Sequence, residues 1–114
     1  MTTIWHNPKC SKSREALKLL EERGKGIEVF KYLETAPSRE EIVTLLAKLG
    51  ISARELMRTK EDLYKELGVA TVEEESVLID VLVEHPKLIE RPILIEGNRA
   101  IIGRPVERVI EFLG

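Results

Sequence analysis

The chain has 114 residues, of which 43% are hydrophobic, 33% charged and 4% aromatic, and 18 basic against 20 acidic side chains give a formal net charge of −2 at pH 7. This length suits one compact domain, so a single domain over residues 1–114 is expected. The balanced charge lacks the basic face typical of nucleic-acid binding, and the apolar runs are too short to cross a bilayer, so neither nucleic acid nor membrane is expected as a partner.

The N-terminal segment predicts a β-α-β unit. Residues 2–5 and 27–30 are short runs typical of strands, and residues 11–23 between them carry apolar side chains at helical spacing. Asn7-Pro8 forms the turn before this helix. A helix between two strands predicts that the strands are parallel.

The middle of the chain predicts several helices. Ser38 and Glu41 have the spacing of a capping box at the start of a helix that Gly50 ends. Further helical segments are predicted at residues 53–57, 61–67 and 72–84. The side chains predicted to face inward from the last of these are Val77, Leu78, Val81 and Leu82.

The C-terminal segment predicts a hairpin and a helix. Residues 92–95 and 99–102 are apolar runs separated by a Gly-Asn turn, and a final helix carries one apolar stripe. The stripe consists of Val106, Val109, Ile110 and Leu113. The complete order predicts an α/β fold with a four-stranded mixed sheet, which is the element order of a thioredoxin-like core.

Cys10 is the only cysteine, so the chain cannot form an internal disulfide, and a reducing cytoplasm is the expected location. It lies between the first strand and the first helix, where backbone N–H groups of the first helical turn point toward the sulfur and favour the thiolate. The same N–H groups could bind a tetrahedral anion. The alternative is that Cys10 only fills the core, but its polar neighbours favour a partly exposed, reactive thiol.

Charged and hydroxyl side chains surround this cysteine in the sequence. His6, if protonated, would lower the thiol pKa, as would the nearby cations Lys9, Lys12 and Arg14. Each has a simpler alternative. His6 could be hydrogen-bonded only to the backbone, and the two lysines could be solvated surface charges. Ser13 lies one helical turn after Cys10, where its hydroxyl either approaches the sulfur or caps the helix.

Five collinear blocks carry a resemblance that runs nearly from end to end. They are HNPKCSKSR (6–14), YLETAPSREE (32–41), ARELMRTKEDLYKELG (53–68), HPKLIERPILI (85–95) and IGRPVERV (102–109). The sequence resembles the glutaredoxin-dependent arsenate reductase family, and within it the short arsenate-reductase-like subgroup. The resemblance implies a thioredoxin-like fold in which a single cysteine attacks arsenate.

The resemblance also implies roles for individual residues. Cys10 matches the nucleophile, and His6 and Ser13 match the residues that activate its thiolate. The arginines implied to hold the oxyanion are Arg58, Arg91 and Arg104. Guanidinium groups suit this task because two N–H groups can meet two oxygens of one anion.

Two prolines follow predicted oxyanion-binding arginines. Thioredoxin-like folds place a cis-proline at the start of a strand facing the reactive cysteine, and Pro92 is the candidate, which would direct Arg91 toward Cys10. Pro105 is expected in the first turn of the last helix.

A single cysteine cannot reduce its own arsenate adduct, so a second thiol must come from outside the chain. The resemblance implies glutathione as co-substrate and glutaredoxin as partner. No bound cofactor and no metal are expected, because His6, His85 and Cys10 do not have ligand spacing. The chain is expected to be a monomer.

Two other functions remain open. One is an Spx-like regulator that binds RNA polymerase and senses disulfide stress, but its Cys-x-x-Cys switch is absent because Ser13 takes the second position, and Arg104 is a residue that such regulators lack. The other is a glutathione-dependent reductase of thiols or of a different oxyanion, which the sequence does not distinguish from an arsenate reductase.

Overall fold

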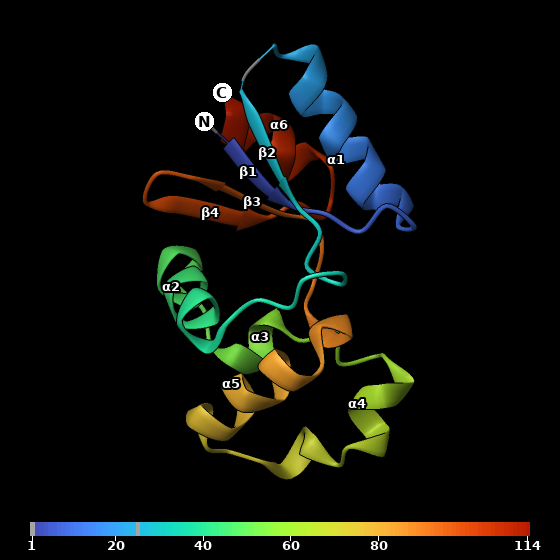
Figure 1. Cartoon of the computed structure of the whole chain (residues 1–114), viewed down its shortest axis with the longest axis vertical. Coiled ribbons are helices and arrows are strands. Elements are labelled where there is room, and N and C mark those ends of the chain that lie inside the picture. Colours follow the sequence, from blue (N-terminus) through green and yellow to red (C-terminus); the bar gives the residue numbers. More distant parts are fainter. Residues whose placement is uncertain (1, 25) are drawn as a thin grey trace. The chain divides into compact units, whose positions relative to one another are not determined.

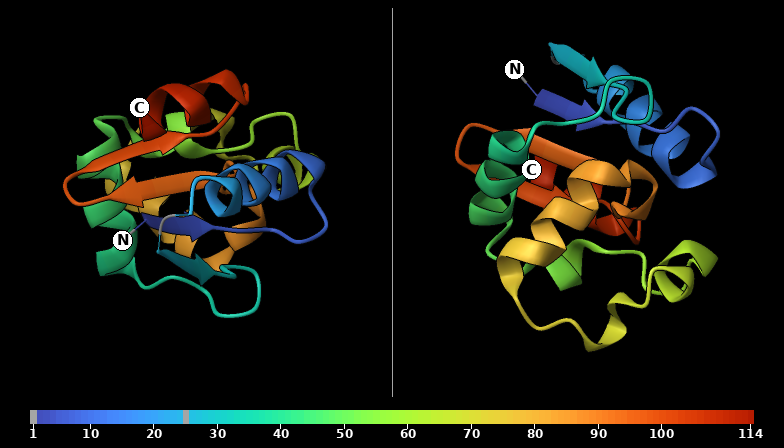
Figure 2. Two further views of the ribbon diagram at one scale, coloured as in Figure 1. Left: turned by 90° about the horizontal axis from the view of Figure 1, so that it is seen from above. Right: turned by 60° about the horizontal axis from the view of Figure 1, so that its bottom comes forward.

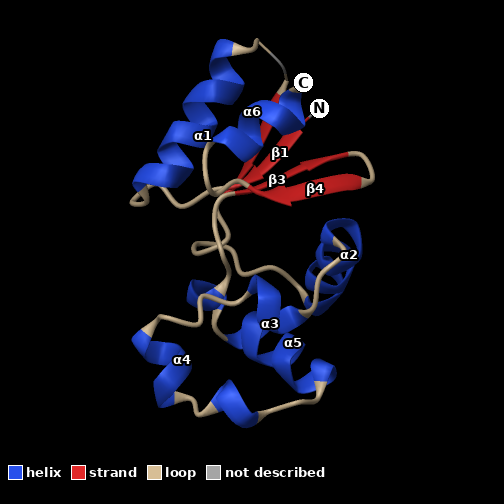
Figure 3. Cartoon of the chain, turned by 180° about the vertical axis from the view of Figure 1, so that it is seen from behind, coloured by secondary structure: helices blue, strands red, loops and turns tan. Residues whose placement is uncertain are grey.

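The computed structural model describes residues 2–24 and 26–114. The chain forms two compact units (Figure 1). The first contains the residues up to Thr35 together with Arg91–Gly114, and the second, Ala36–Glu90, is inserted between these two parts. Figure 3 shows the strands gathered in the first unit, whereas the second consists of helices and loops. None of the helices in the described ranges has the length and apolar character needed to span a membrane.

The sheet of the first unit has four strands in the order β2-β1-β3-β4 (Figure 2). β1 (Thr2–Trp5) pairs in parallel with β2 (Ile27–Phe30) and antiparallel with β3 (Ile93–Glu96). β4 (Arg99–Ile102) pairs antiparallel with β3. The predicted four-stranded mixed sheet of an α/β, thioredoxin-like fold is therefore confirmed.

Two helices of the first unit, α1 (Ser11–Glu22) and α6 (Glu107–Leu113), pack against each other and against the sheet (Figure 3). Burial of apolar side chains between these elements drives their association. The buried core comprises Ile4, Ala16, Leu20, Leu94, Val109, Phe112 and Leu113. Ile110, predicted to face inward, is 44% exposed, because α6 turns Phe112 toward the core instead.

The second unit begins with α2 (Arg39–Leu49), whose predicted capping box is confirmed. The Glu41 backbone N–H donates to Ser38 Oγ at 3.1 Å, and the Ser38 N–H donates to Glu41 Oε1 at 2.9 Å. Gly50 ends the helix with φ +68°, in the left-handed region that favours glycine.

The remaining helices of this unit are short, apart from α5. They are α3 (Ala53–Leu56), α4 (Asp62–Glu66), the 3-10 helix η1 (Val69–Thr71), α5 (Glu75–Glu84) and the 3-10 helix η2 (Pro86–Leu88). α5 begins three residues later than predicted, because Val72 is extended and its carbonyl accepts a hydrogen bond from Arg54 Nη2. Its buried face consists of Leu78, Ile79 and Leu82, so the predicted inward position of Val77 is wrong.

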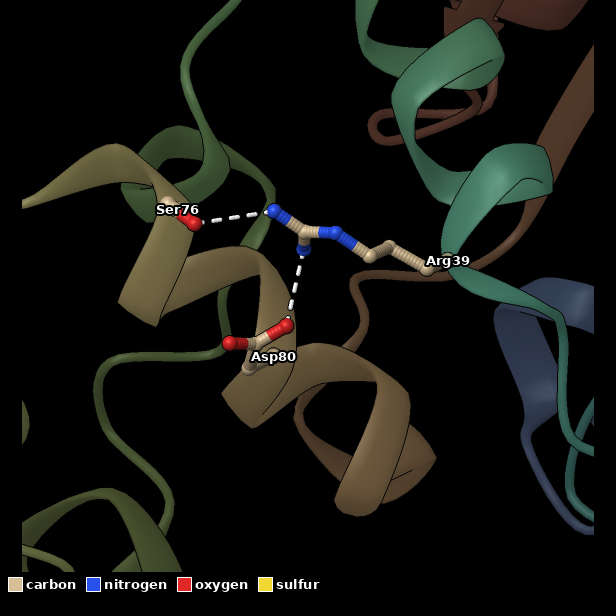
Figure 4. Close-up of polar contacts among 3 residues, drawn as sticks. All are labelled: Arg39, Ser76 and Asp80. Atoms are coloured by element: carbon tan, nitrogen blue, oxygen red, sulfur yellow. Dashed lines mark hydrogen bonds and ion pairs between the residues drawn. The ribbon is translucent and has the colours of Figure 1, made fainter.

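Arg39 links α2 to α5 (Figure 4). Its Nη1 donates to Asp80 Oδ1 at 2.8 Å and its Nη2 donates to Ser76 Oγ at 2.9 Å. The Arg39 and Asp80 side chains are 45% and 57% exposed. Exposed ion pairs of this kind contribute at most about 1 kcal/mol, so apolar packing carries most of the stability of this unit.

Candidate active site around Cys10

The loop between β1 and α1 is fixed by hydrogen bonds to its own backbone. The Cys10 N–H donates to the Asn7 carbonyl at 3.0 Å, and the Lys9 N–H donates to Asn7 Oδ1 at 3.0 Å. Arg14 Nη1 donates to the Pro8 carbonyl at 2.9 Å. Side chains of this loop and of the following helix thus hold Cys10 at the N-cap of α1.

Several groups act on the Cys10 thiol, and their combined effect lowers its pKa. Burial is the largest influence and acts in the opposite direction, since it disfavours the charged form. It is outweighed by hydrogen bonds from the backbone N–H groups of Ser13 and Lys12 and by the charges of Arg91 and Arg104. Both N–H groups belong to the first turn of α1, where the sequence predicts donors that favour the thiolate.

The thiol is less exposed than the sequence indicated. Cys10 is 9% exposed, and the expectation of a partly exposed residue is wrong in this respect. The groups that lower its pKa nevertheless favour the thiolate, the form that acts as a nucleophile.

His6 and Ser13 form a buried pair below the cysteine. His6 Nδ1 lies 2.6 Å from Ser13 Oγ, and the Asn7 backbone N–H donates to the same Oγ at 3.0 Å. Burial lowers the pKa of His6, and the charges of Lys31 and Arg14 lower it further. The imidazole is therefore neutral at pH 7, so it does not assist Cys10 through a positive charge.

The neutral state of His6 leaves two tautomers for this hydrogen bond. The Ser13 oxygen accepts from the Asn7 N–H and keeps one proton and one lone pair, so it donates to an unprotonated Nδ1 or accepts from Nδ1–H, according to the tautomer. Ser13 is fully buried, and its backbone N–H favours the Cys10 thiolate. The Ser13 hydroxyl takes neither of the two positions left open from the sequence, since its hydrogen-bond partners are His6 Nδ1 and the Asn7 N–H.

Arg91 and Arg104 are both close enough to Cys10 for their charges to lower its pKa. The bond between Arg91 and Pro92 is cis, as predicted. The bond between Arg104 and Pro105 is also cis, and the expectation that Pro105 lies in the first turn of the last helix is wrong, because α6 begins only at Glu107.

Arg91 carries N–H donors that have no partner within the described residues. Its Nε and Nη1 atoms are buried and make no hydrogen bond there. Buried donors are satisfied in the great majority of cases, so an exception calls for an explanation. Unpartnered guanidinium N–H donors are suited to an anionic ligand, because its oxygens accept charge-assisted hydrogen bonds.

Gly103 joins the two arginine segments and was not identified from the sequence. Its N–H donates to the Pro92 carbonyl at 2.8 Å, which ties the residue before Arg104 to the residue after Arg91. A Cβ at this position would lie 2.9 Å from Val109 Cγ2 and 3.1 Å from Pro92 Cγ. The only signal in the sequence was the Gly-Arg-Pro triplet itself.

Arg58 belongs to the second unit. Its N–H donates to the Leu88 carbonyl at 2.7 Å, and the Glu90 N–H donates to the Leu56 carbonyl at 2.8 Å. These bonds flank an isolated antiparallel bridge between Met57 and Ile89. Arg58 therefore lies opposite the segment that leads directly into Arg91.

The donor set around Cys10 favours anions over cations. Within residues 2–24 and 26–114, no group of three or more His, Cys, Asp or Glu side chains is placed to hold a metal ion. What surrounds the thiol instead is a pair of guanidinium groups and the N–H groups of a helix N-terminus. Such an arrangement stabilises negative charge on a nucleophile and on its substrate.

The chain is similar to several known proteins over nearly its whole length. Residues 5–112 match the ArsC family. The uncharacterized protein YfgD of Escherichia coli K12 is 54% identical over 97% of this chain and 95% of its own length, and an arsenate reductase of Neisseria meningitidis is 50% identical over 93% and 92%. The solved structure of an arsenate reductase from Vibrio cholerae is 51% identical with a TM-score of 0.92, covering 96% of this chain and 95% of that one. The chain belongs to the ArsC family.

Proposed function

We propose that this chain is an arsenate reductase in which Cys10 is the nucleophile and Arg58, Arg91 and Arg104 bind the oxyanion. The observation that carries the proposal is a thiol of lowered pKa beside the unpartnered N–H donors of Arg91. Relatives at about half sequence identity that are named arsenate reductase support it. The proposed setting is a cytoplasmic monomer.

In the first proposed step, the Cys10 thiolate attacks arsenic(V). A sulfur–arsenic bond forms while one arsenic–oxygen bond breaks, and the departing oxygen takes up protons and leaves as water. The oxidation state of arsenic does not change in this step. The guanidinium groups stabilise the negative charge on the remaining oxygens, and Ser13 and His6 act as positioning residues that hold the N–H groups on the sulfur.

Reduction of arsenic(V) to arsenic(III) needs two electrons, which two thiols supply when they become one disulfide. Cys10 provides the first thiol, and the chain has no second cysteine. We propose glutathione as the second thiol: its sulfur attacks the Cys10 sulfur, arsenite leaves with the electron pair, and a mixed disulfide remains. Glutaredoxin then attacks the glutathione sulfur of that disulfide and regenerates the Cys10 thiol.

The test is turnover of arsenate by the purified chain with glutathione and glutaredoxin, followed by NADPH oxidation through glutathione reductase. Cys10→Ser should abolish turnover. Arg91→Ala should lower kcat/KM roughly 100-fold, because charge-assisted hydrogen bonds to the oxyanion are lost. Arg108→Ala is the matched control, since Arg108 is an exposed arginine of α6, and it should behave as the wild type.

Two results would contradict the proposal. If Arg91→Ala and Arg108→Ala have the same kcat/KM, then Arg91 does not bind the oxyanion. If the wild type reduces a glutathione mixed disulfide but not arsenate, then the chain is a thiol reductase, which is the other function that the sequence left open. Tight binding of the purified chain to RNA polymerase, without arsenate turnover, would favour the regulator.

A further inference from the structure

Arg58 belongs to a cluster of four charged side chains within the second unit. Arg58 Nη2 lies 3.1 Å from Glu61 Oε2, and Arg58 Nε lies 3.8 Å from Glu90 Oε1. The other oxygen of Glu61, Oε1, lies 3.4 Å from Lys87 Nζ. Two carboxylates therefore balance two cations, whereas the surroundings of Cys10 are cationic.

The carboxylate of Glu61 does not serve as a cap for α4, although Glu61 is the residue at which that helix starts. Glu61 is the N-cap residue, a place where Ser, Thr, Asp or Asn normally accepts a hydrogen bond from the first helical turn. The Glu61 side chain makes no such bond, and both of its oxygens are used in ion pairs. The Glu61 N–H donates to the Arg58 carbonyl at 3.1 Å, and this tight turn returns the side chain to Arg58.

The exposure of these side chains indicates which of the ion pairs matters most. Arg58 and Glu61 are 23% and 20% exposed, whereas Lys87 is 63% exposed. Salt and water screen a partly buried pair less than an exposed one, so the Arg58–Glu61 contact outweighs the contact with Lys87. Glu90 is also partly buried, but at 3.8 Å from Nε it is the more distant partner.

We infer that Glu61 is the counter-ion that sets the affinity of the oxyanion site through Arg58, an inference that rests on the proposed role of Arg58 in binding arsenate. A guanidinium whose Nη2 already meets a carboxylate offers fewer donors and less net charge to a second anion. A tetrahedral oxyanion therefore shares Arg58 with Glu61 or displaces it. Glu61 thus lowers affinity for every oxyanion that uses Arg58, and it makes the anion easier to release.

The experiment measures anion binding without chemistry. In the full-length Cys10→Ser variant, arsenate and inorganic phosphate are titrated calorimetrically against the chain with Glu61 and with Glu61→Gln. Removing the carboxylate charge should lower the Kd of both anions roughly three- to tenfold. This is the size of effect expected when one negative charge is removed that repels the anion across a single side chain at a partly screened site. Glu66→Gln is the matched control, because Glu66 is exposed on the same helix and its loss changes the net charge equally.

Two further variants separate this effect from a structural one. In an Arg58→Gln background, Glu61→Gln should leave the Kd unchanged, because Glu61 acts through Arg58. Lys87→Gln should raise the Kd, since Glu61 then interacts with Arg58 alone, and this increase should vanish in the Glu61→Gln background. In the active enzyme, Glu61→Gln should lower the KM for arsenate.

The outcomes are distinguishable from those of the proposed function. If Cys10→Ser binds oxyanions but Glu61→Gln and Glu66→Gln give the same Kd, the role of Glu61 is refuted while the oxyanion site stands. The role of Glu61 is also refuted if Glu61→Gln weakens binding, or if its effect persists without Arg58. If Cys10→Ser binds neither arsenate nor phosphate, both the proposed function and this inference are wrong.

Discussion

Gly103→Ala tests whether the contact that joins the two arginine segments depends on the absence of a side chain. The new Cβ would lie 2.9 Å from Val109 Cγ2, 3.1 Å from Pro92 Cγ and 3.4 Å from Leu94 Cδ1. The first two distances are shorter than the roughly 3.5–4.0 Å at which carbon atoms attract one another. Val109 and Leu94 are fully buried, so neither can move into solvent.

Forcing a methyl group into a packed core costs about 1–3 kcal/mol. For a chain of this length, that corresponds to a fall in Tm of about 4–12 °C. The backbone of Gly103 is outside the left-handed region, so this cost comes from space alone. The strain should also move Arg104 away from its position beside the thiol, and the KM for arsenate should rise with the loss of stability.

Urea unfolding followed by circular dichroism measures the stability change, with Val109→Ala as the second arm of a double-mutant cycle. Removing the Val109 methyl groups relieves the shortest contact, so Gly103→Ala should cost about 1 kcal/mol less in that background. If Gly103→Ala is as stable as the wild type to within about 0.5 kcal/mol, or if the two substitutions are additive, the packing argument is wrong.

Two further predictions concern the titration of site residues. The rate of Cys10 alkylation should rise with pH about a midpoint below the ordinary thiol value of about 8.5, and Arg91→Gln should raise this midpoint because one cation is lost; an unchanged midpoint in the variant would contradict the charge effect. Burial holds the pKa of His6 in the folded chain below its unfolded value of about 6.5. The contribution of neutral His6 to the free energy of unfolding is therefore complete above a pH of about 6.5, and it is lost as the pH falls through the folded pKa. The free energy of unfolding should therefore fall less between about pH 7.5 and pH 5.5 in His6→Asn than in the wild type, because the amide does not titrate and its oxygen can still accept from Ser13. An equal fall in the two chains would refute the assignment.

The elements that the sequence predicts well are those encoded by neighbouring residues. The bounds of β1 and β2 agree with the expected strands, and the capping box of Ser38 and Glu41 starts α2 as expected. Both patterns depend on side chains only a few positions apart, so no knowledge of tertiary packing was needed. Arg91 and Arg104 are more distant in the sequence, and only the resemblance connected them with Cys10.

The errors occur where tertiary contacts override a local pattern. Ile110 fits an apolar stripe but is exposed, since Phe112 fills the core position that the helix offers to the sheet. Val72 fits the start of α5, yet its carbonyl is bound by Arg54, a residue 18 positions earlier, and the helix begins later. The contact between Gly103 and Pro92 and the pairing of Arg58 with Glu90 likewise join distant residues that periodicity cannot connect.

Trp5 gives the molecule a built-in optical reporter. It is the only tryptophan in the sequence, it is 4% exposed, and its ring contacts Phe30 edge-on and stacks on Tyr32. Because it immediately precedes His6 at the end of β1, its fluorescence emission should respond to any change in the loop that carries the nucleophile. Ligand occupancy and adduct formation can therefore be followed by emission spectra in real time, without attaching a dye.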